Sequence, residues 1–102
     1  MMEADIPEEL TAQVALALIH KIAAVSSNIV LVSHALKRGH QRRINRIMVE
    51  RCLMRGAITE GPYVAAASGN WRMNVSRYAA GEEMTCVVEI DWPNKLLVVT
   101  VF

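Results

Sequence analysis

The C-terminal stretch from Trp71 to Phe102 decides the fold, and its sequence is WRMNVSRYAAGEEMTCVVEIDWPNKLLVVTVF. Apolar and polar residues alternate along its first two segments, which is the period of a strand with one buried face. Turn-forming residues, among them Gly81 and Pro93, separate the segments. The pattern therefore predicts three consecutive strands joined by short turns, at residues 71–78, 84–91 and 95–102.

The last of these segments is apolar on both faces. Strand alternation divides its residues into one face with Leu97, Val99 and Val101 and another with Leu96, Val98 and Phe102. A strand that is buried on both sides is most simply placed in the centre of a sheet or against a covered face.

The N-terminal third predicts a helix. Pro7, Glu8 and Glu9, after Asp5 or Ile6, are residues typical of a helix opening. Apolar residues then recur every three or four positions and predict a buried stripe of Leu10, Val14, Leu18, Ile22 and Val25, broadened by Leu16 and Ile19. Residues 29–32 are β-branched or leucine and predict a short strand.

Two short helices are expected in the middle of the chain. Ser33 is a suitable N-cap for a helix that runs to Arg42, although Gly39 weakens it. Asn45 is a suitable N-cap for the next helix, which ends at Gly56. Residues 57–67 are predicted to be extended, and Ser68, Gly69 and Asn70 to form a turn.

These elements predict an α+β fold in the order α-β-α-α-β-β-β-β, with N-terminal helices packed on one face of a twisted antiparallel sheet. With 102 residues, the chain is expected to form one domain, residues 1–102, with the N-terminal helix in residues 1–27 and an α+β core in residues 28–102.

Composition excludes several classes of protein. No apolar run approaches the roughly 20 residues of a membrane span, and the first nine residues carry acids but no Lys or Arg, so we expect a cytoplasmic protein with no membrane partner. Cys52 and Cys86 lie 34 residues apart in apolar surroundings, which favours reduced core thiols. His20, His34 and His40 lack the spacing of a ligand set, so we expect no metal and no cofactor.

Charge is distributed unevenly along the chain. The net charge is only +1, but the segment from Lys37 to Arg55 contains seven basic residues and a single acidic one, Glu50. Phosphate contacts by such a run give nucleic-acid affinity without sequence readout. The alternative is a solvated helix surface. The candidates for nucleic-acid binding are Lys37, Arg42, Arg43 and Arg46.

The segment that begins Ser33-His34-Ala35-Leu36-Lys37-Arg38 resembles a small bacterial and phage family known as domain of unknown function 4258. The resemblance is carried by His34, Ala35, Arg38, Arg42, Ile44, Val49 and Gly56 and, later, by Gly69, Trp71, Gly81 and Val99-Thr100-Val101-Phe102. It covers about residues 28–102. Arg43 and Asn45 depart from it, because the family resemblance implies Gly and Thr there. The layout is also similar to the RelE and MqsR group of ribonuclease toxins.

That similarity implies metal-independent RNA cleavage, which needs a general base, an acid and cations around the phosphorane. We take as catalytic candidates His34, Arg38, Arg72 and Tyr78. His34 would be a neutral base at a helix N-terminus, or else a structural hydrogen-bonding residue. Arg38 would bind a phosphate, or else pair with Glu60, Glu89 or Asp91.

Arg72, Asn74, Ser76 and Tyr78 share one strand face, which would line a groove or simply face solvent. Arg77 and Lys95 are further candidates. The leading hypothesis is a toxin-like ribonuclease with RNA as substrate and a cognate protein partner. Its alternative is a non-catalytic module of a mobile element that binds a protein or nucleic acid. The apolar excess also predicts a homodimer or a dedicated partner.

Overall fold

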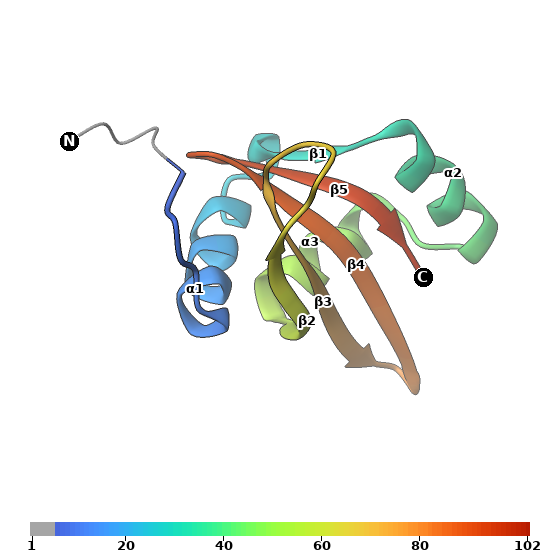
Figure 1. Ribbon diagram of the computed structural model, residues 1–102. Helices are drawn as coiled ribbons and strands as arrows, with labels where there is room; N and C mark the ends of the chain where they lie inside the picture. Colours follow the sequence, from blue (N-terminus) through green and yellow to red (C-terminus); the bar gives the residue numbers. More distant parts are fainter. Residues whose placement is uncertain (1–5) are drawn as a thin grey trace.

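A computed structural model describes residues 6–102 of the chain (Figure 1). The predicted order of helices and strands is confirmed, with one added 3₁₀ turn. The elements are α1 (Ala12–Ala23), the turn η1 (Ser26–Asn28), β1 (Ile29–Leu31), α2 (Ser33–Arg42), α3 (Arg46–Arg55), β2 (Ala57–Val64), β3 (Trp71–Ala79), β4 (Glu82–Asp91) and β5 (Lys95–Val101). No helix in this part of the chain is both long enough and apolar enough to cross a membrane.

The sheet is mixed, which corrects the prediction of an antiparallel one. Its strand order is β1-β5-β4-β3-β2, and β1 runs parallel to β5 while the other neighbours are antiparallel. Parallel neighbours need a crossover connection rather than a hairpin. Here the chain leaves β1, forms α2, α3 and the β2–β4 meander, and only then returns beside β1 as β5.

Strand β5 lies between β1 and β4, as its two apolar faces predicted. The predicted division of its faces is wrong beyond Val99, however. Val87 pairs with Thr100 and Val88 pairs with Val98, so Val99 is an extra residue in a β-bulge. The bulge changes the alternation, and Val101 joins Leu96 and Val98 on the fully buried face.

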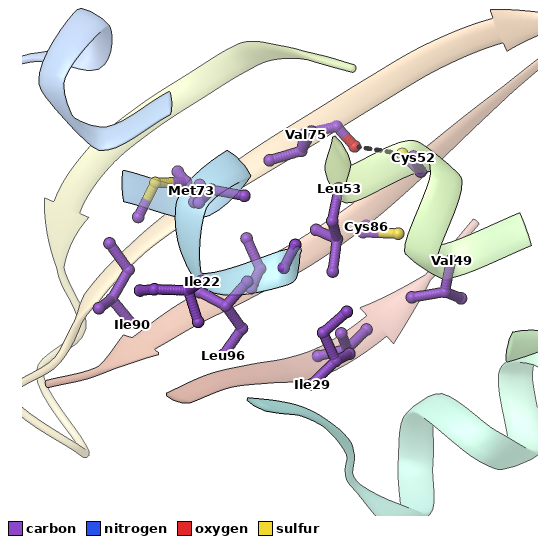
Figure 2. Close-up of a cluster of buried hydrophobic side chains, with 14 of the residues drawn as sticks. Ile22, Ile29, Val49, Cys52, Leu53, Met73, Val75, Cys86, Ile90 and Leu96 are labelled. Carbon is purple, nitrogen blue, oxygen red and sulfur yellow. Dashed lines mark hydrogen bonds between the residues drawn. The ribbon is translucent and has the colours of Figure 1, made fainter. Parts of the chain in front are cut away.

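Helices α1 and α3 cover the core face of the sheet (Figures 1 and 2). Helix α1 begins at Ala12 rather than near Pro7, because the Thr11 side chain caps it by accepting a hydrogen bond from the Val14 amide at 3.2 Å. Asp5 lies outside the described residues. The buried positions of α1 are Ala15, Ile19, Ile22 and Ala23. Of the predicted stripe, Ile19 and Ile22 are among them, whereas Val14 and Val25 are about half exposed.

The ends of α2 and α3 follow local signals. Asn45 caps α3 as predicted and accepts from the Met48 amide at 2.9 Å, and Gly56 ends the helix. Ser33 is the first residue of α2 rather than its cap, which is Val32. Gly39 is required in α2 because a Cβ there would lie 2.8 Å from the Ile44 carbonyl oxygen.

Candidate anion-binding site

The residues predicted to be catalytic lie in three places. His34 occupies the first turn of α2, and Arg38 lies one turn later. Neither side chain has a hydrogen-bond or ion-pair partner within residues 6–102, where the ion pairs are Arg46–Glu50 and Arg72–Glu89. Helix α2 packs on β5, which is two strands away from β3.

Arg72 and Tyr78 lie at opposite ends of β3. Arg72 is opposite Glu89 in the register with β4, and Tyr78 is opposite Glu83 beside the hairpin turn. Six residues of strand separate their Cα atoms by about 20 Å. The structure therefore does not gather the four predicted residues into one cluster.

The Arg72 guanidinium binds the Glu89 carboxylate, which is buried on the outer face of the sheet. Arg72 donates from Nε at 2.8 Å and also from Nη2, while Ser68 Oγ and Asn70 Nδ2 donate to the other carboxylate oxygen at 2.7 and 3.1 Å. Burial alone would raise the pKa of Glu89, but the hydrogen bonds from Arg72, Ser68 and Asn70 outweigh it and lower that pKa. Glu89 thus joins the β2–β3 loop and Arg72 of β3 to strand β4.

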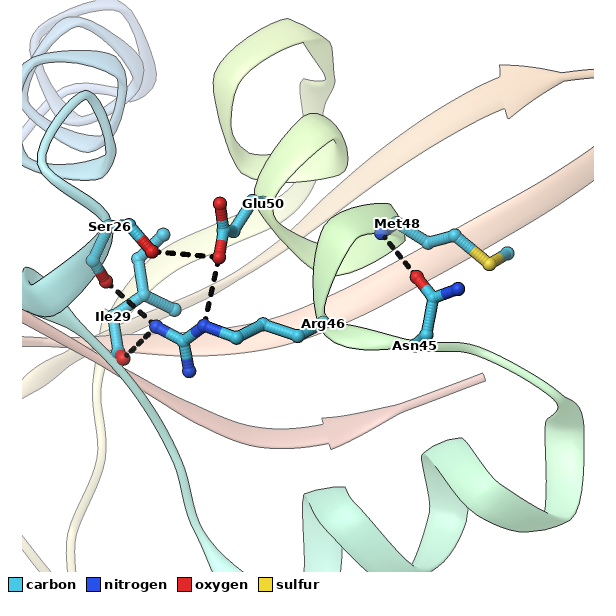
Figure 3. A network of polar contacts seen from close by, with 6 residues as sticks. All are labelled: Ser26, Ile29, Asn45, Arg46, Met48 and Glu50. Carbon is cyan, nitrogen blue, oxygen red and sulfur yellow. Dashed lines mark hydrogen bonds and ion pairs between the residues drawn. The ribbon is translucent and has the colours of Figure 1, made fainter.

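Arg46 also has internal partners (Figure 3). Its Nε donates to Glu50 at 2.8 Å, and its Nη2 donates to the carbonyl oxygens of Ser26 and Ile29, each at 2.8 Å. These contacts join α3 to η1 and to the start of β1. Of the residues predicted to bind nucleic acid, Lys37, Arg42 and Arg43 therefore remain exposed without such partners in the described chain.

A cleft opens between the α2–α3 corner and the β3–β4 hairpin. We call it the arginine cleft. Its volume is about 420 Å³, within the range of small-ligand sites. Four arginines line it, and they come from α2, the α2–α3 turn, α3 and β3: Arg42, Arg43, Arg51 and Arg77. The rest of the lining consists of the apolar residues Ile44, Met48, Ala79, Ala80 and Met84 and the acids Glu82 and Glu83.

Three residues with a left-handed backbone conformation shape this cleft. Arg43 has φ 57° and ends α2, which turns the chain back into α3. Ala80 and Gly81 have φ 54° and 80° and form the tight β3–β4 turn, a conformation with positive φ at both central residues that suits hairpins. None of the four arginines forms an ion pair within residues 6–102. Cationic groups thus converge on one space without carboxylate partners of their own.

The sequence does not predict Arg51 as a site residue, and it offers Arg77 only as a further candidate. A signal for Arg77 does exist. It continues the alternation of Met73 and Val75, whose side chains are buried on the core face, so a charge stands at an inward-facing position. No comparable local signal distinguishes Arg51 from the other basic residues of α3.

The two cysteines, Cys52 on α3 and Cys86 on β4, are free and buried beside each other in the core (Figure 2). The Cys52 thiol donates to the Val75 carbonyl at 3.4 Å. Its hydrogen bond with Cys86, together with burial, raises the pKa of Cys86. Within residues 6–102, no group of three or more His, Cys, Asp or Glu residues is arranged to hold a metal ion.

Comparison with known protein families gives a match over most of the chain. The model of a family described as a domain of unknown function, DUF4258, matches residues 31–102, close to the range of the resemblance seen in the sequence. No curated protein matches the chain. No solved structure matches it, so the likeness to the RelE and MqsR group stays a prediction.

Proposed function

We propose that this chain, which belongs to the DUF4258 family, binds single-stranded RNA and holds phosphates of the strand in the arginine cleft. The observation that carries the proposal is the convergence of four arginines, without ion-pair partners in the described residues, on one cavity. Guanidinium groups recognise phosphate oxygens by paired hydrogen bonds. Because the net charge of the chain is only +1, the affinity for RNA would come from the arginines gathered at the cleft and not from the charge of the protein as a whole.

The floor of the cleft favours a single strand over a duplex. Ile44, Met48 and Met84 offer apolar surface among the arginines. Unpaired bases can lie against such surface while their phosphates meet the cations, whereas paired bases are stacked inside a duplex.

Binding can be tested by fluorescence anisotropy of a labelled single-stranded RNA. Arg51→Ala should weaken binding by about 5-fold, and should lower the slope of log K against log salt by about 0.7 for each phosphate that the variant no longer neutralises. Arg55→Ala is the matched control, since Arg55 is also exposed on α3 but does not line the cleft. Equally weakened binding in the two variants would contradict a site at the cleft.

Cleavage of the bound RNA is the second candidate function. The candidate for proton transfer is Tyr78, which lies between Arg77 and Ala79 near the β3–β4 hairpin, on the opposite face of β3 from these two cleft residues. Tyr78 is 72% exposed and has no hydrogen-bond partner among the described residues, so its hydroxyl would act on RNA that continues past the hairpin from the phosphates held in the cleft.

We expect cleavage of a mixed RNA in EDTA to leave cyclic-phosphate ends, and Tyr78→Phe to slow it by a factor on the order of 100. His34→Ala, run beside it, tests the base predicted from sequence. His34 is eight residues before Arg42 on α2, about 12 Å along the helix axis, so we expect a smaller decrease in rate. RNA binding without cleavage would leave the non-catalytic binding module as the function.

A further inference from the structure

We propose that the arginine cleft takes a guanine nucleotide, with Glu82 binding the base and the arginines binding its phosphate. This inference rests on the proposed function, because it names the ligand that the same cleft prefers. Three observations support the inference. Glu82 lies on the core-facing side of β4, the cleft has no ion pair across it in the described chain, and the floor of the cleft is apolar.

Strand register places Glu82 on the side of the cleft. Arg77 is opposite Met84 and Ala79 is opposite Glu82 in the β3–β4 pairing, and opposite residues share a face. Glu82, Met84 and Cys86 alternate along the core-facing side of β4, and Cys86 is fully buried there. Glu83 also lines the cleft, but its strand position is on the other face of β4, opposite Tyr78.

The charges in the cleft are of both signs but do not neutralise one another. Glu82 lines the same cavity as Arg42, Arg43, Arg51 and Arg77, yet no carboxylate oxygen lies within 4.0 Å of their nitrogens in residues 6–102. A ligand that fits between them needs an anionic group at one end and hydrogen-bond donors at the other. A nucleotide has this arrangement.

Guanine is the base that matches a carboxylate best. A carboxylate has two acceptor oxygens, and guanine alone among the four RNA bases presents two adjacent donors, the ring N1–H and the N2 amino group, on its Watson–Crick edge. Adenine and cytosine place a ring acceptor nitrogen beside their amino group, and uracil places carbonyl oxygens beside its N3–H. Met48 and Met84 provide polarisable surface for the flat base.

Titration calorimetry with the four nucleoside 5′-monophosphates tests the inference. We expect GMP to bind about 10-fold or more tightly than AMP, CMP or UMP. Glu82→Gln should abolish this preference, because an amide offers a single acceptor oxygen beside a donor NH₂. Asp91→Asn, at an exposed position at the far end of β4 that does not line the cleft, is the matched control and should retain it. A thermal melt of each variant checks that it folds.

The outcomes separate this inference from the proposed function. Equal binding of all four nucleotides, or loss of the GMP preference in Asp91→Asn but not in Glu82→Gln, would overturn the role of Glu82. If Arg51→Ala still weakened RNA binding, RNA binding at the cleft would stand. Absence of both RNA and nucleotide binding would overturn both proposals.

Discussion

Replacement of Gly56 by alanine is expected to lower the free energy of unfolding by about 3 kcal/mol, at the upper end of the usual cost of overpacking. A Cβ at this position would lie 2.5 Å from the Cys52 carbonyl oxygen, 2.7 Å from the Ser76 carbonyl oxygen and 2.9 Å from Val75 Cγ1. Two of these atoms are backbone and cannot move without shifting α3 or β3. The φ of Gly56 is −79°, so the cost is one of packing and not of conformation.

Urea unfolding followed by circular dichroism measures this effect. Gly69→Ala is the control, because a Cβ at Gly69 would meet no atom within 4 Å although its φ is 75°. The control should be destabilised by about 1 kcal/mol from the left-handed conformation alone. A smaller destabilisation in Gly56→Ala than in Gly69→Ala would show that α3 and β3 separate easily at this junction.

The helix end at Gly56 is one of the features of the fold that could be predicted from the sequence. Gly56 as a helix end, Asn45 as a cap and the alternation along β3 and β4 are local signals, and the structure confirms them. The parallel pairing of β1 with β5 depends on residues more than 60 positions apart, such as Ile29 and Leu96. The β-bulge at Val99 depends on the partner strand, so neither follows from local pattern.

The site was predictable to a smaller degree. The basic run between Lys37 and Arg55 identified Arg42 and Arg43, which do line the arginine cleft. The sequence could not separate them from Arg46, whose guanidinium binds carbonyl oxygens 17 and 20 residues away. Nor could it show that Arg72 pairs with Glu89 or that Arg77 lines the same cleft as α3, because both arrangements form only when the meander folds against the helices.

Glu89→Gln is expected to lower the free energy of unfolding by about 2 to 3 kcal/mol at pH 7. Removing one partner of a buried ion pair typically costs about 3–5 kcal/mol, and the Arg72 side chain is 30% exposed, which reduces the cost. The glutamine oxygen can still accept from Ser68 or Asn70. Its NH₂ group would face the guanidinium donors of Arg72, and no acceptor would remain there.

The difference between the wild type and Glu89→Gln should depend on pH in one direction. The folded-state pKa of Glu89 is lowered, so its carboxylate contributes stability that is fully present above the unfolded value of about 4.3 and is lost as pH falls through the folded pKa. Urea unfolding from pH 7 to pH 3 should therefore show the two proteins converging below about pH 4.5. Glu83→Gln, at an exposed position on the same strand, should cost little at any pH. A constant difference for Glu89→Gln across the range would mean that the amide disrupts packing of the β2–β3 loop and that charge pairing with Arg72 contributes little.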